Sequence, residues 1–289
     1  MPELPEVETV RRGLNERTLH RRVTAVEVLL DRTIAYPSVA EFQAGLVGTA
    51  FQTWHRRGKY LIGELAEGAG HVGVHLRMTG QALWTQPEVP LEKHTRVRFL
   101  MGDQELRYVD QRTFGQIWWV PPGVAPPDVM QGLQRLGPEP FDAAFSDEYL
   151  VAWMRDRKRP IKNALLDQSM VAGIGNIYAD ESLFLSGINP LTYCASLKPK
   201  QLSTLRTYII DVLQTSISAS GTTLRDYRTV DGVNGNYGSQ AWVYGQDGQA
   251  CRVCATTIER VKLAGRSAHF CPRCQPRPPH DLARNVRQV

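Results

Sequence analysis

Residues 251–274 read CRVCATTIERVKLAGRSAHFCPRC and contain four of the five cysteines of this 289-residue chain. The spacing is Cys251-x2-Cys254-x16-Cys271-x2-Cys274. Two Cys-x-x-Cys pairs at this separation can place four thiolates around one tetrahedral Zn²⁺ ion. The alternative, a pair of disulfides, requires an oxidising compartment, and the amino-terminal sequence has no pattern of an export signal. We therefore expect one structural zinc ion, in a cytoplasmic protein.

The residues between the two cysteine pairs predict a β-hairpin. Thr257–Leu263 alternates in the period-2 manner of a strand, Ala264–Ser267 supplies a turn with Arg266 at its tip, and Ser267–Phe270 returns. A ribbon this small buries little core, so the metal would supply most of its folding energy. The fifth cysteine, Cys194, is expected to be a half-buried structural thiol.

The positive charge of the chain is concentrated around this finger. Residues 251–289 contain eight Arg or Lys against two acidic residues, a net charge of +6, whereas the whole chain carries +5. The rest of the chain is therefore close to neutral. A local basic segment is typical of a module that contacts a polyanion, although a basic tail that serves only solubility has the same composition.

The remaining composition is that of a globular protein. Hydrophobic residues make up 42% and charged residues 22%, which argues against a disordered or fibrous chain. The length predicts two domains with a small appendix. No apolar run approaches the roughly 18 residues of a membrane-spanning helix.

The order of the expected elements places a β-rich part before a helical part. A helix is predicted within residues 1–14, where Pro5 suits the first turn and Glu6 complements the dipole. Strands are expected at Val23–Leu30, Tyr60–Leu65, His71–Leu76, Gln81–Trp84, Arg96–Leu100, Glu105–Val109 and Gln116–Val120, a spacing that favours an antiparallel sandwich or barrel. After a Pro-rich linker at 121–127, helices are expected at Ser146–Arg155, Ile161–Leu166, Ile177–Leu185 and Lys200–Ser218.

A glycine-containing segment precedes one of these helices. Gly173-Ile174-Gly175-Asn176 leads into a helix that begins at Asn176, and helix N-termini bind anions such as phosphate. Arginines and lysines between Arg155 and Lys162 add positive charge nearby. The same pattern also fits an N-cap asparagine that closes an ordinary helical hairpin, and the two interpretations stay open on these residues alone.

Several short motifs in one order resemble the bacterial formamidopyrimidine-DNA glycosylases. These motifs are Pro2-Glu3-Leu4-Pro5-Glu6-Val7-Glu8, Arg57-Gly58-Lys59-Tyr60-Leu61, Leu76-Arg77-Met78-Thr79-Gly80, Gly173-Ile174-Gly175-Asn176-Ile177-Tyr178 and the four-cysteine finger. The resemblance runs from Pro2 to about Gln275.

The resemblance implies an α+β fold: an N-terminal β-sandwich with an N-terminal helix, then a helix-two-turn-helix domain with a C-terminal zinc-finger β-hairpin. The expected domains are a catalytic β-sandwich at 1–125, a helix-two-turn-helix DNA-binding domain with a lesion-capping loop at 135–235, the zinc finger at 240–275, and a basic tail at 276–289. The family implies that DNA lies between the two large domains.

The chemistry of the amino terminus follows from the residues. If Met1 is removed, Pro2 exposes a secondary amine, and an α-amino group has a pKa of about 7.7–8.0 against about 10.4 for lysine. A useful fraction is then unprotonated and can attack the sugar carbon C1′, and the resulting iminium has no N–H to lose. Glu3 is the expected general acid/base, with Glu6 in a supporting role. A helix-initiating proline and a carboxylate that complements the dipole would have the same sequence.

The resemblance also assigns residues that contact DNA. Met78, Arg112 and Phe114 match the side chains that fill the space of an everted base, although Gln111 and Thr113 stand where the family often has Pro and Arg. Without the resemblance, Met78 and Phe114 would be ordinary core residues. The matching contacts to the DNA backbone and around the damaged site are Lys59, which also belongs to the catalytic group, and Lys162, Asn176, Tyr178 and Arg266. A base-capping loop is expected at 222–237, with Thr222, Thr223, Arg225 and Tyr227.

The resemblance implies a base-excision repair enzyme of bacterial type. It would remove oxidised purines, 8-oxoguanine and formamidopyrimidines, from double-stranded DNA and act as an apurinic/apyrimidinic (AP) lyase through β,δ-elimination. Two alternatives stay open: an endonuclease-VIII-like glycosylase for oxidised pyrimidines, and a non-catalytic zinc-ribbon DNA-binding protein. We expect a cytoplasmic, nucleoid-associated monomer with no membrane partner.

Overall fold

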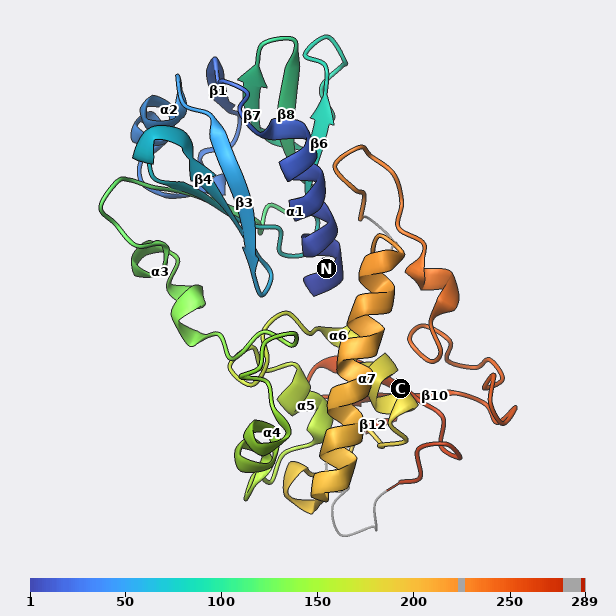
Figure 1. The fold of residues 1–289 in the computed structure, drawn as a ribbon. Helices are drawn as coiled ribbons and strands as arrows, with labels where there is room; N and C mark the ends of the chain where they lie inside the picture. The colour runs from blue at the N-terminus through green and yellow to red at the C-terminus, as the bar shows by residue number, and fades with distance from the viewer. Residues whose placement is uncertain (223–226, 278–286, 289) are drawn as a thin grey trace. The chain divides into compact units, whose positions relative to one another are not determined.

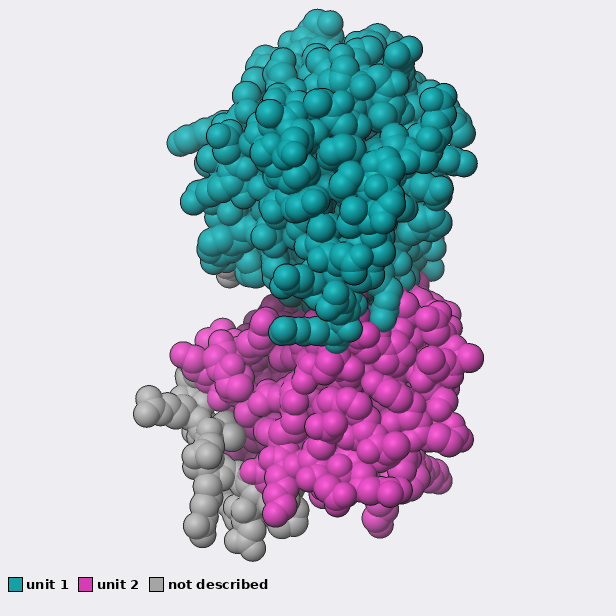
Figure 2. All heavy atoms as spheres, turned by 90° about the vertical axis from the view of Figure 1, so that its left-hand side faces the viewer, with its two compact units in different colours: residues 1–135, 217–238 teal, residues 136–216, 239–289 magenta. Residues whose placement is uncertain are grey.

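The computed structural model describes residues 1–222, 227–277 and 287–288, and its contacts divide the chain into two compact units (Figures 1 and 2). The first unit comprises residues 1–135 and 217–238, and the second comprises residues 136–216 and 239–289. The first unit therefore contains a segment that is remote in sequence from the rest of it. Within the described residues, no helix combines the length and the apolar character needed to cross a membrane.

Two sheets and two helices build most of the first unit. In chain order its elements are α1 (Leu4–Thr18), β1 (Ala25–Val28), η1 (Asp31–Thr33), β2 (Ile34–Tyr36), α2 (Val39–Leu46), β3 (Phe51–Arg57), β4 (Tyr60–Leu65), η2 (Ala66–Gly68), β5 (His71–His75), β6 (Gly80–Thr85), β7 (Thr95–Met101), β8 (Gln104–Asp110), β9 (Gln116–Val120), α3 (Pro126–Val129) and η3 (Gln131–Arg135). One sheet has the order β2-β9-β5-β4-β3 and the other β1-β7-β8-β6. All strand pairs are antiparallel except β2 with β9.

One hydrophobic core lies between the sheets. The Phe51 ring of β3 lies 4.6 Å from the Trp54 ring and 6.4 Å from the Phe99 ring of β7, measured between ring centroids. Both sheets and both helices contribute buried side chains to this cluster. The arrangement confirms the predicted N-terminal β-sandwich with a helix at its start.

Helix α1 is fixed to strand β3 by polar contacts as well as by its apolar face. Val7, Val10 and Leu14 are buried on one face. The Asn15 side chain accepts a hydrogen bond from the Trp54 backbone N–H and donates one to the Trp54 carbonyl, at 2.8 and 3.0 Å. At the other end of the helix, burial opposes ionisation of Glu8, but hydrogen bonds and charges from arginines of α1 and β3 lower its pKa to about 2. Helix α1, which directly follows the first residues of the chain, is therefore held firmly against strand β3.

Val230 and Asp231, in the segment 217–238, contact helix α1 and strand β6. The Trp84 N–H donates to the Val230 carbonyl at 2.8 Å, and Arg17 pairs with Asp231 at 3.0 Å. Gly13 of α1 gives room to Val230, because a Cβ at Gly13 would lie 2.9 Å from Val230 Cγ2. This segment is thus an integral part of the first unit.

The second unit is helical and ends in a small sheet. Its elements are α4 (Asp147–Met154), α5 (Ile161–Leu165), α6 (Asn176–Leu185), η4 (Cys194–Ser196), most of α7 (Pro199–Ser218), β10 (Glu259–Leu263), β11 (Arg266–Phe270) and β12 (Arg287–Gln288), and η5 (Tyr237–Gln240) leads into it. The sheet order is β11-β10-β12. Ala264 and Gly265 form the β10–β11 turn with φ of 47° and 80°, so the turn has two residues instead of the predicted four.

The predicted strands and long helices are confirmed, with ends that shift by a few residues. The N-cap serine Ser146 is also confirmed, since its hydroxyl accepts a hydrogen bond from the Tyr149 N–H at 3.1 Å. Strands β2, β3 and β12, helix α2 and the short 3-10 helices were not predicted. Residues 126–135 in and after the expected linker form α3 and η3.

Replacing Phe51 with alanine should lower the free energy of unfolding by about 3–5 kcal/mol, because it removes a fully buried ring between the two sheets. The measurement is urea unfolding of the full chain, with Val47→Ala as the control at a side chain that is 47% exposed. We expect the control to change stability by less than about 0.5 kcal/mol. Equal effects of the two substitutions would contradict the shared core.

Candidate functional site

The amino-terminal residues of the first unit are buried around two carboxylates. Pro2 is buried, whereas Met1 is 39% exposed. Glu3 is the N-cap residue of α1 and is only 2% exposed. Its backbone N–H donates to Glu6 Oε2 at 2.8 Å. The Glu3–Glu6 pair therefore fixes the backbone next to Pro2.

Glu6 also binds the segment that returns to the first unit. Its Oε1 accepts a hydrogen bond from the Thr222 N–H at 2.7 Å, and the Tyr227 hydroxyl reaches the Glu6 carbonyl at 3.4 Å. Gly221 has a φ of +82°, and a Cβ there would lie 3.1 Å from the Glu6 side chain. Thr222 and Tyr227 thus form the described base of the expected capping loop, while Thr223 and Arg225 lie outside the described residues.

Lys59 lies in the turn between β3 and β4 and is mostly buried. Its charge acts on His75 at the end of β5, as does the charge of Arg77. Burial and these two cations lower the pKa of His75 to about 3, so its imidazole is neutral at physiological pH. The His75 Nδ1 accepts a hydrogen bond from the Arg77 N–H at 3.0 Å. His75 was not among the predicted residues, and its only sequence signal is its place two residues before Arg77 in the Leu-Arg-Met-Thr-Gly motif.

Met78 and Phe114 are exposed and are not core residues. Met78 lies in the turn between β5 and β6 and is 37% exposed, and Phe114 lies between β8 and β9 and is 53% exposed. The guanidinium of Arg112 lies 4.8 Å from the centroid of the Phe114 ring. The alternative that these two apolar side chains merely fill the core is therefore wrong.

In the second unit, Asn176 is the first residue of α6. The N-cap is Gly175, so Asn176 does not cap the helix. Its Oδ1 is buried and has no hydrogen-bond partner within the described residues. The preceding glycine segment is braced by the Gln168 amide, which accepts from the Gly173 N–H at 3.0 Å and donates to the Ile174 carbonyl at 2.9 Å. The free Oδ1 is an acceptor and cannot bind an anion, whereas the backbone N–H groups at the start of α6 can donate to one.

Lys162 and Tyr178, in contrast, have buried side chains. Lys162 is 1% exposed, and its Nζ lies 2.6 Å from Asp180 Oδ1 and donates to the Ser267 carbonyl in the finger hairpin. The Tyr178 hydroxyl lies 2.6 Å from the Ser216 hydroxyl of α7. Both residues therefore link parts of the second unit to one another instead of pointing to solvent.

Three further buried groups of the second unit escaped the sequence analysis. Asp180 accepts from the His269 N–H at 3.0 Å, with the His269 Nδ1 at 2.9 Å. Glu181 accepts backbone N–H groups from residues 242–244 at 2.8–3.0 Å, and burial raises its pKa. The available signal was the adjacent acidic pair Asp180-Glu181 in a helix rich in apolar residues, since acidic groups are buried only when they have partners.

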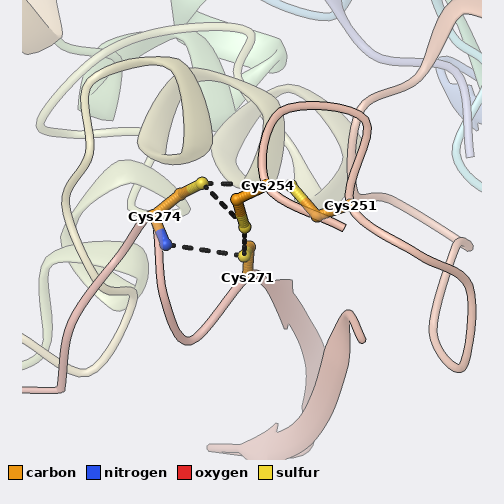
Figure 3. Close-up of side chains that lie close together, drawn as sticks. All are labelled: Cys251, Cys254, Cys271 and Cys274. Atoms are coloured by element: carbon orange, nitrogen blue, oxygen red, sulfur yellow. Dashed lines mark hydrogen bonds between the residues drawn. The ribbon is translucent and has the colours of Figure 1, made fainter. Parts of the chain in front are cut away.

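The four cysteines of the finger converge on one point (Figure 3). Their sulfur atoms all lie within 4.8 Å of one another, and three of the pairs are 3.4–3.9 Å apart. A tetrahedron with Zn–S bonds of about 2.3 Å has sulfur atoms about 3.8 Å apart, so the set fits zinc. Hydrogen bonds from Thr256 lower the pKa of Cys254 to about 6, whereas burial raises the pKa of Cys271 and Cys274, so metal binding must displace protons from these two thiols. These residues are a zinc site, as predicted.

Arg266 lies at the start of β11, next to the hairpin turn, and is exposed. Its neighbour in the register is Leu263, which is buried. Beside it, Ser267 is bound by Lys162 through its carbonyl. Arg266 is therefore exposed, while its neighbours Leu263 and Ser267 are held by burial and by the hydrogen bond from Lys162.

Three families match successive parts of the chain. Residues 1–117 match the formamidopyrimidine-DNA glycosylase N-terminal domain, residues 136–228 match the H2TH domain of the same enzymes, and residues 248–277 match a zinc finger found in these glycosylases and in isoleucyl-tRNA synthetase.

Individual relatives match over almost their full length. The formamidopyrimidine-DNA glycosylase of Nostoc punctiforme is 60% identical over 279 residues, 95% of this chain and 96% of that protein. Two solved structures of the Lactococcus lactis enzyme are similar to this structure, and each has 34% sequence identity to this chain. A mutant with DNA containing Fapy-dG has a TM-score of 0.89 and covers 96% of this chain and 100% of that one. The complex with DNA containing an abasic site has a TM-score of 0.88 and covers 95% and 100%.

Replacing Cys254 with serine should remove the bound zinc, because three thiolates and a hydroxyl form a much weaker site. The measurement is the zinc content of the purified full chain, by atomic emission. Cys194→Ser is the matched control, since Cys194 is a buried free thiol outside the cluster, and it should retain one zinc per chain. Equal zinc content in the two variants would refute the assignment.

Proposed function

The chain belongs to the formamidopyrimidine-DNA glycosylase family, and on that premise we propose that the secondary amine of Pro2 is its nucleophile. The observation that carries this proposal is the buried Pro2-Glu3-Glu6 arrangement at the start of α1. Removal of Met1 must precede the chemistry, since the Pro2 nitrogen is otherwise an amide. The exposure of Met1 is compatible with that removal.

The chain is a base-excision repair glycosylase for oxidised purines in double-stranded DNA, with an associated AP lyase activity. The Lactococcus lactis relative has been crystallised with Fapy-dG DNA and with DNA containing an abasic site, which correspond to the substrates of these two activities. The zinc ion is structural, because all four thiolates that bind it are supplied by the protein.

In the first step, C1′ of the damaged nucleotide loses its bond to the base and gains a bond to the Pro2 nitrogen. The neutral Pro2 amine forms the N–C1′ bond and loses its N–H proton, and the bond from C1′ to the base nitrogen breaks as the base leaves and takes up one proton, so the exchange is balanced. Glu3 is the proposed general acid for the sugar ring oxygen. Ring opening then gives an iminium at Pro2, whose nitrogen carries no hydrogen, so the iminium persists as an electron sink.

The later steps are eliminations from this iminium. Loss of the C2′ proton drives cleavage of the C3′–O bond and releases the 3′ phosphate, and a second elimination releases the 5′ phosphate. We assign proton transfer in these steps to Glu3, and we assign to Lys59 the phosphate next to the reacting sugar. Glu6 supports Glu3 by fixing its backbone N–H.

The proposed DNA contacts divide into two groups. Met78, Arg112 and Phe114 fill the space of the everted base, with Arg112 facing the orphaned partner base. Asn176 and Arg266 bind phosphates. Lys162 and Tyr178 act on DNA indirectly in this proposal, because their side chains are buried: Lys162 supports the finger turn beside Arg266, and Tyr178 supports helix α6 beneath Asn176.

The remaining assignments follow the family. We propose a catalytic module at 1–125, a DNA-binding module with a lesion-capping loop at 135–235, the finger at 240–275 and a basic tail at 276–289. Thr222 and Tyr227 would hold the base of the capping loop, with Thr223 and Arg225 in its span. The curated relatives are bacterial, and we propose a cytoplasmic location with association to the nucleoid through the substrate.

Borohydride should trap the mature chain on duplex DNA with 8-oxoguanine opposite cytosine, because the iminium is reduced to a stable amine. Pro2→Gly should lower trapping by at least about tenfold relative to the wild type, since a primary amine replaces the secondary amine and its imine is a weaker electron sink. Pro122→Gly, at an exposed loop position, is the matched control and should trap like the wild type. The yield of covalent complex on a denaturing gel is the measurement.

The same assay separates the alternatives. Stronger trapping on thymine glycol opposite adenine than on 8-oxoguanine opposite cytosine would indicate an oxidised-pyrimidine enzyme. No trapping on either duplex would indicate a non-catalytic DNA-binding protein. Equal trapping by the wild type and Pro2→Gly would refute Pro2 as the nucleophile.

Arg112→Ala should weaken the preference for cytosine opposite the lesion, because the guanidinium no longer donates to the acceptors of that base; the expected loss of discrimination is about 1–3 kcal/mol. Excision rates of 8-oxoguanine opposite each of the four bases give the preference. Arg135→Ala, an exposed arginine in the same unit, is the control. An unchanged ranking and spread across the four bases would remove Arg112 from this role.

A further inference from the structure

Two loops of the first unit carry the three residues assigned to the space of the everted base. The turn between β5 and β6 carries Met78, and the loop between β8 and β9 carries Arg112 and Phe114. Both apolar side chains are exposed. Both loops join the same two sheets and lie side by side although they are separate in sequence, because β5 pairs with β9 and β6 pairs with β8.

Asp110, the last residue of β8, closes the second loop at both ends. Its carboxylate is 1% exposed. Oδ1 accepts from the Arg112 N–H at 3.2 Å, and Oδ2 accepts from the Gly115 N–H at 2.8 Å. Between these two anchors, Thr113 has a φ of +56°, which is strained for a β-branched residue and persists only where surrounding contacts impose it. Asp110 supplies such contacts.

Thr79 joins the first loop to the second. Its hydroxyl donates to Asp110 Oδ1 at 2.5 Å and accepts from the Arg112 N–H at 3.0 Å. Thr79 is buried and directly follows Met78 in the chain. One hydroxyl and one carboxylate therefore connect the backbone beside Met78 to the backbone of Arg112.

Glycines let both loops lie on the same aromatic ring. A Cβ at Gly115 would lie 1.5 Å from the Tyr108 hydroxyl oxygen, and a Cβ at Gly80 would lie 2.4 Å from it. Tyr108 belongs to β8, and its buried hydroxyl makes no hydrogen bond within the described residues. Burial, with the charge of Asp110 as a second cause, raises the pKa of Tyr108, so the ring stays neutral beneath the loops.

We propose that Thr79 and Asp110 are positioning residues that hold Met78, Arg112 and Phe114 as one preformed wedge. The proposal rests on the function assigned above to those three side chains. Two independent loops would each lose conformational freedom on entering the base stack, whereas cross-linked loops have lost it already in the free protein. The cross-link should therefore promote base eversion and have little effect on the later chemistry.

An effect on base eversion without an effect on the later chemistry can be distinguished from general destabilisation, which would slow both. Excision of 8-oxoguanine requires the base to leave the stack, whereas an abasic site has no base to move. Loss of the cross-link should slow single-turnover excision and leave strand cleavage at a preformed abasic site nearly unchanged. A 2-aminopurine placed next to the lesion reports insertion of the wedge, because its fluorescence rises when it is unstacked.

Thr79→Val keeps the shape of the side chain and removes both hydroxyl hydrogen bonds, and we expect about tenfold slower excision and a slower fluorescence rise. Cleavage at the abasic site should stay within about twofold of the wild type. Thr79→Ser retains the hydroxyl and should restore excision. Thr95→Val is the matched control: Thr95 is buried and its hydroxyl donates to the Glu92 carbonyl, away from the Thr79–Asp110 pair, so excision and cleavage rates of this variant should both match the wild type.

Asp110→Asn is the second variant. The asparagine amide keeps one acceptor oxygen, but its NH2 group cannot accept the hydrogen bond that the other carboxylate oxygen accepts. It should show the same split between excision and abasic-site cleavage. The positioning role is overturned if both variants excise at the wild-type rate, or if they lose excision and abasic-site cleavage in equal measure. Phe114→Ala tests the wedge separately from the residues that position it. Normal excision and a normal fluorescence rise in Phe114→Ala would overturn the wedge itself. Slow excision in Phe114→Ala together with normal excision in Thr79→Val would overturn only the positioning role of Thr79 and Asp110.

Discussion

The first unit depends on the carboxylate of Glu6. One oxygen accepts the Glu3 N–H and the other accepts the Thr222 N–H, so a single buried group connects the first residues of the chain to a segment more than 200 residues later. A buried carboxylate is costly unless its oxygens are satisfied, and these backbone donors satisfy both. Loss of Glu6 would therefore release both the backbone next to Pro2 and the base of the capping loop.

The second unit is organised by buried charges of a different kind. Asp180 lies between Lys162 and His269, and Glu181 binds the backbone of residues 242–244. Both acids lie on α6, the helix that starts at Asn176. The zinc ion gives the finger its local fold, whereas these buried contacts attach the finger to the helices. The exposed Arg266 and the N-terminus of α6 are thus parts of one framework.

The sequence predicted what depends on local pattern and missed what depends on distant partners. Strands β4 and β9 have the predicted bounds because apolar residues and flanking turns mark them. Strand β3 was missed because a register shift between Phe51 and Thr53 breaks the period-2 pattern, so that Phe51 and Trp54 face the same core. Helix α2 was missed although Ser38 and Glu41 form a capping box.

The candidate site divides in the same way. The zinc ligands were predictable because their spacing alone defines the site. The burial of Lys162 was not predictable, because its partners Asp180 and Ser267 lie on other elements. The exposure of Met78 and Phe114 also required the structure, since an apolar residue in a β-rich sequence is usually buried. The return of residues 217–238 to the first unit had no local signal.

The most direct test of the central claim is the position of the covalent bond to DNA. Borohydride-trapped complex on 8-oxoguanine duplex is digested with protease and nuclease, and the modified peptide is sequenced by tandem mass spectrometry. We predict that the sugar remnant is on the nitrogen of Pro2, at the amino terminus of a chain that has lost Met1. A remnant on the side chain of Lys59 or of any other lysine, with Pro2 unmodified, would contradict this account.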